Sequence, residues 1–387
     1  MKCVWAVNIM KHQKLPDEDV RTTRREVLIH MSAAALGAVV SGAVVAKEST
    51  PKPGIADPGS DMRKLQSYMT LPGPGKEDHS CDPRTYFREL SNWGRWGKDD
   101  VLGTLNLITP AVRTAAAALV RDGVAVGCSW EMDPRPFGSE MQRYMSVLPS
   151  QLIDGAEGNG GHLSAVAEHL SMSSHGRWMT HLDALSHAFW DGKMYNGYSA
   201  DSVTATGGAS MGDVAAVTAG IVSRGVLLDI AALLEVEALE GGYTVTPEQL
   251  EAAERRQKVR VRTGDVVLLR TGCGRRVKEA GGYLPGFYGL PGWHPRCLPW
   301  LHERGVAAIG NDAAQDPFPT GFAWSDHYIP IHDVGIIAMG LWLIDWCNLE
   351  ALAAKCVELG RYEFQFIVSP LRLTGCSASP VHPIALF

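Results

Sequence analysis

The centre of this sequence reads Met179-Thr180-His181-Leu182-Asp183-Ala184-Leu185-Ser186-His187. His181 and Asp183 are two residues apart, so on an extended strand their side chains point to one face and reach a single cation. His187 follows Asp183 by four residues, a spacing that returns it to the same side if the chain turns helically after the strand. His175 lies six residues before His181. These four donors predict a metal site or an acid/base site.

The chemistry of the donors narrows the choice of metal. Imidazole nitrogen and carboxylate oxygen without thiolate suit Zn²⁺, Mn²⁺ or Fe²⁺ better than a sulfur-lined structural zinc site. A single histidine in such a stretch is more often a surface or hydrogen-bonded residue than a ligand. From the spacing alone, a functional site and ordinary polar residues in a turn both stay open.

The composition limits the class of protein. The chain has 387 residues, of which 45% are hydrophobic and 20% charged, which allows one large α/β domain or two to three smaller ones. The net charge of −6 gives no basic signature for nucleic acid. After residue 50 no apolar run is long enough to span a bilayer, so we expect no stable membrane insertion of the mature chain. GxGxxG and Walker patterns are absent, which argues against a nucleotide enzyme.

The first fifty residues have the pattern of an export signal. Thr23-Arg24-Arg25-Glu26-Val27-Leu28 precedes a mildly apolar stretch, Ile29 to Ala46, and the paired arginines are typical of twin-arginine signals. We therefore expect a signal over residues 1–46, a flexible linker rich in proline and glycine over 47–80, and a globular domain over 81–387. Export to the periplasm or the exterior follows from this signal. An uncleaved anchor or a cytoplasmic tail is the alternative.

Helices and strands alternate along the globular part. Thr109-Pro110 and the capping box at Thr246-Pro247-Glu248-Gln249 each open a helix. The apolar run from Gly335 to Ile344 is either a buried strand or a helix passing into one, and Tyr362 to Val368 is the last expected strand. This alternation predicts an α/β fold with a mixed sheet.

Further metal donors occur in the last third of the chain. Asp345 follows a nearly continuous apolar run, and a buried carboxylate there must be paired or ligating. The other donors of this region are Asp312, Asp316, Asp326, His327, His332 and Asp333.

The motif Thr180-His181-Leu182-Asp183, with His187 four residues later, resembles the T-H-x-D-x-x-x-H core of the putative cyclase family. That family includes arylformamidase (kynurenine formamidase) and isatin-hydrolase-like enzymes. The resemblance extends from about Tyr86 to Phe387. It also includes the segments Asn92-Trp93-Gly94-Arg95-Trp96-Gly97, Leu102-Gly103-Thr104-Leu105-Asn106, Asp191-Gly192-Lys193-Met194-Tyr195-Asn196-Gly197, His294-Pro295-Arg296-Cys297-Leu298-Pro299-Trp300-Leu301 and Pro380-Val381-His382-Pro383-Ile384-Ala385-Leu386-Phe387.

The resemblance implies a single-domain, swivelling β/β/α hydrolase with one or two divalent cations, Zn or Mn. His181 and Asp183 would be ligands, and His187 would be the acid/base. His332 would match a later ligand histidine, and Asp345 stands where many relatives carry a ligand glutamate. The resemblance also implies a small-molecule substrate and a homo-oligomer.

One position departs from the family pattern. The family carries a histidine four residues before the histidine of the T-H pair, and this chain has Arg177 there. His175 then supplies the missing ligand, or the site holds one metal or none. Arg177 would also suit a substrate carboxylate.

The function predicted is a metal-dependent hydrolase of an amide, ester or lactone. An exported small-molecule binding protein with a degenerate metal site is the alternative, and a metal-dependent isomerase or dehydratase stays open.

Overall fold

The computed structural model describes residues 80–132, 143–149, 166–176, 179–279, 289–320 and 329–387. These residues belong to one unit of the chain, Pro58–Phe387. The expected signal over 1–46, the linker over 47–80 except Ser80, and Arg177 lie outside the described residues.

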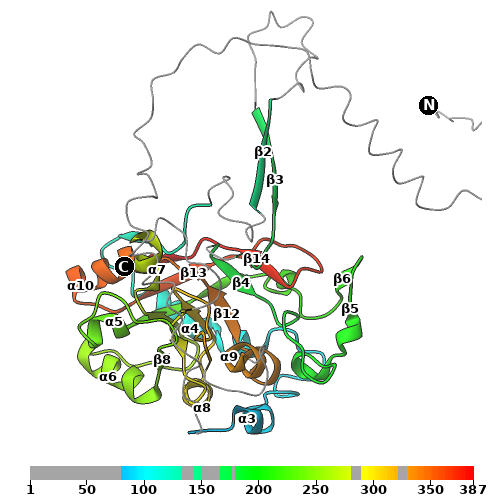
Figure 1. Cartoon of the computed structure of the whole chain (residues 1–387), viewed down its shortest axis with the longest axis horizontal. Helices are drawn as coiled ribbons and strands as arrows, with labels where there is room; N and C mark the ends of the chain where they lie inside the picture. The colour runs from blue at the N-terminus through cyan, green and yellow to red at the C-terminus, as the bar shows by residue number, and fades with distance from the viewer. Residues whose placement is uncertain (1–79, 133–142, 150–165, 177–178, 280–288, 321–328) are drawn as a thin grey trace, which may run out of the picture. The chain divides into compact units, whose positions relative to one another are not determined.

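A nine-stranded mixed sheet forms the centre of this unit (Figure 1). Four neighbouring strands, β7, β9, β11 and β12, run parallel, and the strands on both sides of them pair antiparallel. The single α/β domain with a mixed sheet is therefore confirmed. The order across the sheet is β1 (Ala125–Gly127), β15 (Ile384–Leu386), β13 (Glu363–Val368), β7 (Ile221–Asp229), β9 (Val266–Arg270), β11 (Ala308–Asn311), β12 (Trp342–Asp345), β4 (His181–Asp183) and β14 (Ala378–Pro380).

The parallel strands form the core of the sheet. Every residue of β9, β11 and β12 is buried. Strands covered on both faces carry continuous apolar runs instead of alternating ones, which is the pattern that their sequences show. Three small ribbons accompany the sheet: β2 (Arg143–Pro149) with β3 (Val166–Met172), β5 (Val203–Thr204) with β6 (Gly208–Ala209), and β8 (Thr244–Val245) with β10 (Gly292–Trp293).

Helices pack around the sheet, and their starts follow the expected caps. The Thr109 hydroxyl accepts the amide N–H of Val112 at the start of α4, and Thr246 and Gln249 form the capping box of α6. Both helices pack on β7. The α-helices are α3 (Pro83–Glu89), α4 (Pro110–Ala117), α5 (Ile230–Leu233), α6 (Pro247–Gln257), α7 (Cys273–Glu279), α8 (Cys297–Arg304), α9 (Pro330–His332) and α10 (Glu350–Leu359). The 3₁₀ turns are η2 (Gly103–Leu107), η4 (Tyr195–Gly197), η5 (Ala200–Ser202) and η6 (Val214–Ala216).

The long apolar run passes from helix into strand, which is one of its two expected forms. Residues Asp333–Met339 form a π-helix, η7, and the chain enters β12 after Gly340. Gly340 has a φ of +66°, and a Cβ atom there would lie 2.5 Å from the ring of Tyr195, so the turn requires glycine. π-helices are frequent at functional sites, and this one follows His332 directly.

The C-terminal tail contains more structure than its sequence indicated. The expected strand from Tyr362 to Val368 appears as β13, but β14 and β15 follow it. Both are three residues long and contain or adjoin proline, so they carry little strand signal of their own. They form because β4 and β13 supply pairing partners. Among the described helices, none is long and apolar enough to cross a membrane.

Candidate metal centre

The predicted motif lies on β4, between β12 and β14. β4 runs antiparallel to β12, so His181 at its start pairs in register with Asp345 at the end of β12, and Asp183 pairs with Leu343. His181 and Asp183 therefore share one face of a strand, as their spacing predicted. The site forms at the carboxyl end of a central parallel strand, where open α/β sheets bind their ligands.

Hydrogen bonds fix the start of β4. The Thr180 hydroxyl donates to the carbonyl oxygen of Trp346 (2.6 Å) and accepts the amide N–H of Trp130 (3.3 Å). His181 Nδ1 lies 2.8 Å from the carbonyl oxygen of Met179. A carbonyl oxygen only accepts, so Nδ1 donates to it, and Nε2 is the ring nitrogen that faces the cluster, 3.6 Å from Asp183 Oδ1.

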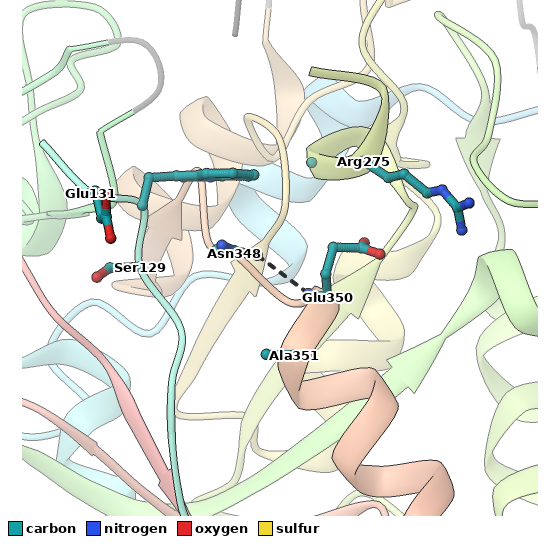
Figure 2. Close-up of a pocket in the computed structure, with 8 residues that line it drawn as sticks. Ser129, Glu131, Arg275, Asn348, Glu350 and Ala351 are labelled. Carbon is teal, nitrogen blue, oxygen red and sulfur yellow. Dashed lines mark hydrogen bonds between the residues drawn. The ribbon is translucent and has the colours of Figure 1, made fainter. Parts of the chain in front are cut away.

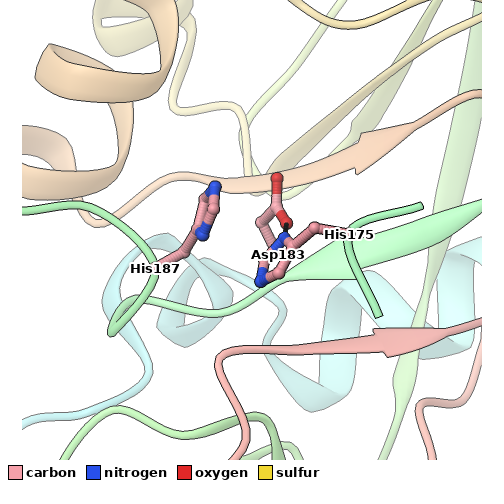
Figure 3. A group of neighbouring side chains, drawn as sticks. All are labelled: His175, Asp183 and His187. Carbon is pink, nitrogen blue, oxygen red and sulfur yellow. Dashed lines mark ion pairs between the residues drawn. The ribbon is translucent and has the colours of Figure 1, made fainter. Parts of the chain in front are cut away.

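His187 returns to the site through a tight turn after β4. Its amide N–H donates to the carbonyl oxygen of Ala184 (3.0 Å), and this single turn does not continue as a helix. The imidazole of His187 stacks on that of His175, with ring centroids 3.9 Å apart and planes 20° apart. Figure 3 shows His187 and His175 near the Asp183 carboxylate. The four-residue spacing therefore places His187 on the expected side.

His175 contacts the same carboxylate. Its Nδ1 lies 2.9 Å from Asp183 Oδ1, an ion-pair distance (Figure 3). Its Nε2 lies 3.0 Å from the hydroxyl of Ser377. His175 is thus part of the site, although it lies two residues away from the position where the family pattern has a histidine.

His332, on α9, and Asp345 complete the cluster. His332 Nε2 is 3.7 Å from Asp183 Oδ2 and 3.6 Å from Asp345 Oδ2. Its other nitrogen, Nδ1, is 2.6 Å from Asp316 Oδ2. A carboxylate at that nitrogen fixes the tautomer and the orientation of a metal-binding histidine, and it directs Nε2 into the cluster.

The residues fit a divalent cation. Asp183 is 1% exposed, and within the described part of the chain neither of its carboxylate oxygens has a hydrogen bond of normal geometry. A buried carboxylate without such partners is costly unless a cation neutralises it. Two groups of donors share Asp183, one with His175 and His187 and one with His181 and Asp345, and each has its donor atoms within 4.8 Å of one another.

The titratable side chains of the cluster shift one another's pKa values. Burial alone would raise the pKa of Asp183, but the imidazoles of His187 and His181 lower it below its usual value. Burial lowers the pKa of His187 to about 4. Burial would also lower the pKa of His332, but Asp316 and Asp345 raise it well above its ordinary value. At neutral pH the site therefore contains an ionised carboxylate beside a neutral His187.

Two further donors of the last third, Asp312 and Asp333, do not join the cluster. Asp312 accepts hydrogen bonds from the backbone N–H and hydroxyl of Thr271 and from the N–H of Gly272, so it stabilises the end of β9. Asp333 accepts the N–H of Ile329. Asp326 and His327 lie outside the described residues.

A separate cavity of about 1060 Å³ lies elsewhere on the unit (Figure 2). Two of its charged lining residues form ion pairs, Glu350 with Arg270 (2.9 Å) and Arg275 with Glu237 (3.1 Å). None of its described lining residues belongs to the histidine cluster. The cavity is lined by Ser129, Trp130, Glu131, Gly274, Arg275, Asn348, Glu350 and Ala351.

The family model described as putative cyclase matches residues 100–315, which is more than half of the chain. The chain belongs to the putative cyclase family. The resemblance of its motif is thereby confirmed. A solved structure described as a novel cyclase is 28% identical, with a TM-score of 0.68, and the match covers 77% of this cyclase-family chain and 100% of that one.

Two isatin hydrolases are more distant. Isatin hydrolase A from Ralstonia solanacearum is 23% identical with a TM-score of 0.46, covering 72% of this chain and 97% of that one. Isatin hydrolase A from Labrenzia aggregata, bound to benzyl benzoate, is 21% identical with a TM-score of 0.45, covering 71% and 96%. No curated protein sequence matches this one.

The contact of His175 with Asp183 predicts that His175→Ala lowers the metal content. The variant removes one donor from the group that also contains His187, so we expect fewer metal equivalents per chain than in the wild type. Elemental analysis after purification without chelator measures this. His382→Ala, which changes an exposed histidine bonded to Ser129, should leave the metal content unchanged. Equal metal in the wild type and His175→Ala would show that His175 is not a ligand.

Proposed function

We propose that this chain is a metal-dependent hydrolase that cleaves an amide, ester or lactone bond of a small carbonyl compound. The observation that carries the proposal is the buried Asp183 carboxylate, which lacks hydrogen bonds of normal geometry and lies between imidazole groups. Such an arrangement contributes little to a folded core and suits a cation well.

The two groups of donors that share Asp183 indicate which residues would hold the cations. His181, Asp183 and Asp345 would hold one, with His332 beside them, and His175 with Asp183 would contribute to a second. A divalent cation in such a site supplies Lewis acidity towards a carbonyl oxygen and lowers the pKa of a water molecule. Zn and Mn are both consistent with nitrogen and carboxylate donors.

His187 would act as the acid/base. Its lowered pKa keeps the imidazole neutral near pH 7, so a ring nitrogen can accept a proton from the attacking water. The same nitrogen would then deliver the proton to the leaving nitrogen or oxygen of the substrate. Its side chain is partly exposed, unlike those of His181 and Asp183, so it is the member of the motif that a substrate reaches most easily.

Arylformamidase-like chemistry is one candidate within this class, because Thr180-His181-Leu182-Asp183 and His187 resemble the core motif of the family that includes those enzymes. The alternative, a binding protein with a degenerate site, is motivated by Arg177 in place of the family's histidine, and Arg177 lies outside the described residues. No observation on the described residues favours it.

A substrate panel tests the proposal. The full chain is freed of metal with a chelator, reloaded with Zn²⁺ or Mn²⁺, and assayed with N-formyl aryl amides, lactones and aryl esters. We expect hydrolysis of at least one class, lost on chelation and restored on reloading. Binding of these compounds without turnover at any metal loading would contradict the proposal and favour a binding protein.

A further inference from the structure

Gln315 is fully buried beside the candidate metal centre. Its Nε2 donates to Asp345 Oδ1 (2.8 Å) and to the carbonyl oxygen of Ile344 (3.0 Å). Its Oε1 accepts the indole N–H of Trp293 (2.9 Å). All the polar atoms of this side chain therefore have partners.

These partners allow only one orientation of the amide. The indole N–H of Trp293 can only donate, so it must face the amide oxygen of Gln315. The carbonyl oxygen of Ile344 can only accept, so it must face the amide nitrogen. The same nitrogen then holds Asp345 Oδ1 as a hydrogen-bond acceptor.

The backbone around Gln315 is held equally firmly. The amide N–H of Trp293 donates to the carbonyl oxygen of Gln315 (3.0 Å). A Cβ atom at the neighbouring Gly292 would lie 2.4 Å from the same oxygen, so the close approach of β10 requires glycine there. Trp293 therefore binds both the backbone and the side chain of Gln315.

We propose that Gln315 is a positioning residue that makes Asp345 a ligand through one oxygen. Asp345 Oδ1 accepts the hydrogen bond from Gln315. Asp345 Oδ2, which is 3.6 Å from His332 Nε2, is then the oxygen that faces the cluster. Without the amide, the carboxylate would be free to rotate and to present either or both oxygens. The inference rests on the proposed function in one respect, namely that the cluster holds a divalent cation.

The next residue in the chain supports this role. Asp316 holds His332 Nδ1, so two consecutive residues of the loop after β11 each orient a different candidate ligand. Through these hydrogen bonds, the loop at the end of β11 holds both Asp345 on β12 and His332 on α9. Outer partners of this kind set metal affinity without touching the metal.

The test is Zn²⁺ affinity, measured by competition with a chromophoric chelator. We expect Gln315→Met, which keeps the length of the side chain and removes its hydrogen bonds, to weaken Zn²⁺ binding about 10–100-fold. Gln257→Met is the matched control. Gln257 bonds the backbone of Leu227 and Asp229, and its hydrogen bonds within the described part of the chain reach no candidate ligand, so its replacement should leave Zn²⁺ affinity unchanged.

The same substitution in a chain that also carries Asp345→Asn separates a positioning role of Gln315 from a general effect on stability. If Gln315 acts through Asp345, Gln315→Met should cause little further loss of affinity when added to Asp345→Asn. Equal losses in the two backgrounds, or an unchanged affinity in the single variant, would overturn the proposal.

If Gln315→Met does not fold, Trp293→Phe provides the same test, because it keeps Gln315 and removes the bond that fixes its orientation. We expect weaker Zn²⁺ binding, and unchanged binding in that variant would overturn the positioning role. A wild-type chain that binds neither Zn²⁺ nor Mn²⁺ would instead overturn the proposed function itself.

Discussion

Asp183→Asn is expected to remove metal binding and hydrolysis together. Asp183 is the member that the two groups of donors share, and its carboxylate has no other partner of normal hydrogen-bond geometry within the described residues. Asparagine keeps the size of the side chain but removes its charge. Because loss of an outer partner alone costs about 10–100-fold in metal affinity, we expect a loss of more than about 100-fold here. Metal titration and turnover on the active substrate measure both effects.

A second buried carboxylate provides the control. Asp312→Asn makes the same chemical change at a carboxylate whose hydrogen-bond donors, among the described residues, are Thr271 and Gly272. It should lower the free energy of unfolding, because the backbone N–H groups of Thr271 and Gly272 lose a charged acceptor, and it should leave metal content normal. Full metal occupancy and full turnover in Asp183→Asn would contradict the proposed site.

His187→Gln is expected to abolish most turnover and to spare the metal. General acid–base catalysis by a positioned side chain contributes about 10²–10⁴-fold, and kcat at saturating metal should fall by that factor. Metal content per chain should stay close to the wild-type value. His302→Gln, at a histidine that contacts Asn92 outside the cluster, should change neither quantity.

The structure makes this experiment decisive for the role of His187. His187 lies in one of the two groups that have metal-binding geometry, together with His175 and Asp183. Loss of metal in His187→Gln would identify His187 as a ligand, and the acid/base would then have to be another group. Retained metal with lost turnover would support the acid/base role.

The local part of the site could be predicted from the sequence. The face shared by His181 and Asp183 follows from the two-residue period of a strand, and the return of His187 needs only one turn. These relations involve residues close in sequence, so their spacing contains the necessary information.

The distant part could be predicted only as a set of residue types. His332 and Asp345 stood among several acidic and imidazole groups, and the resemblance to a family selected them. The proximity of Asp345 to the motif depends on the pairing of β12 with β4, which joins segments more than 150 residues apart. His332 lies on α9 and is held there by Asp316. The separation of Asp312 from the cluster depends on long-range contacts in the same way.

Gln315 shows what sequence reasoning missed. A glutamine after a buried strand carries no signal of metal chemistry, and its role appears only when Trp293, Ile344 and Asp345 meet it in space. The segment from Asn311 to Asp316, which has four polar residues at the end of β11, is a hint in the sequence, because carboxyl ends of parallel strands collect ligand-binding residues.

The most direct test of the central claim is the metal content of the wild-type chain, purified without chelator and analysed for all divalent transition metals. The two groups around Asp183 predict one or two equivalents of Zn or Mn per chain. A chain that contains no metal, and takes up none when incubated with Zn²⁺ or Mn²⁺, would contradict the account.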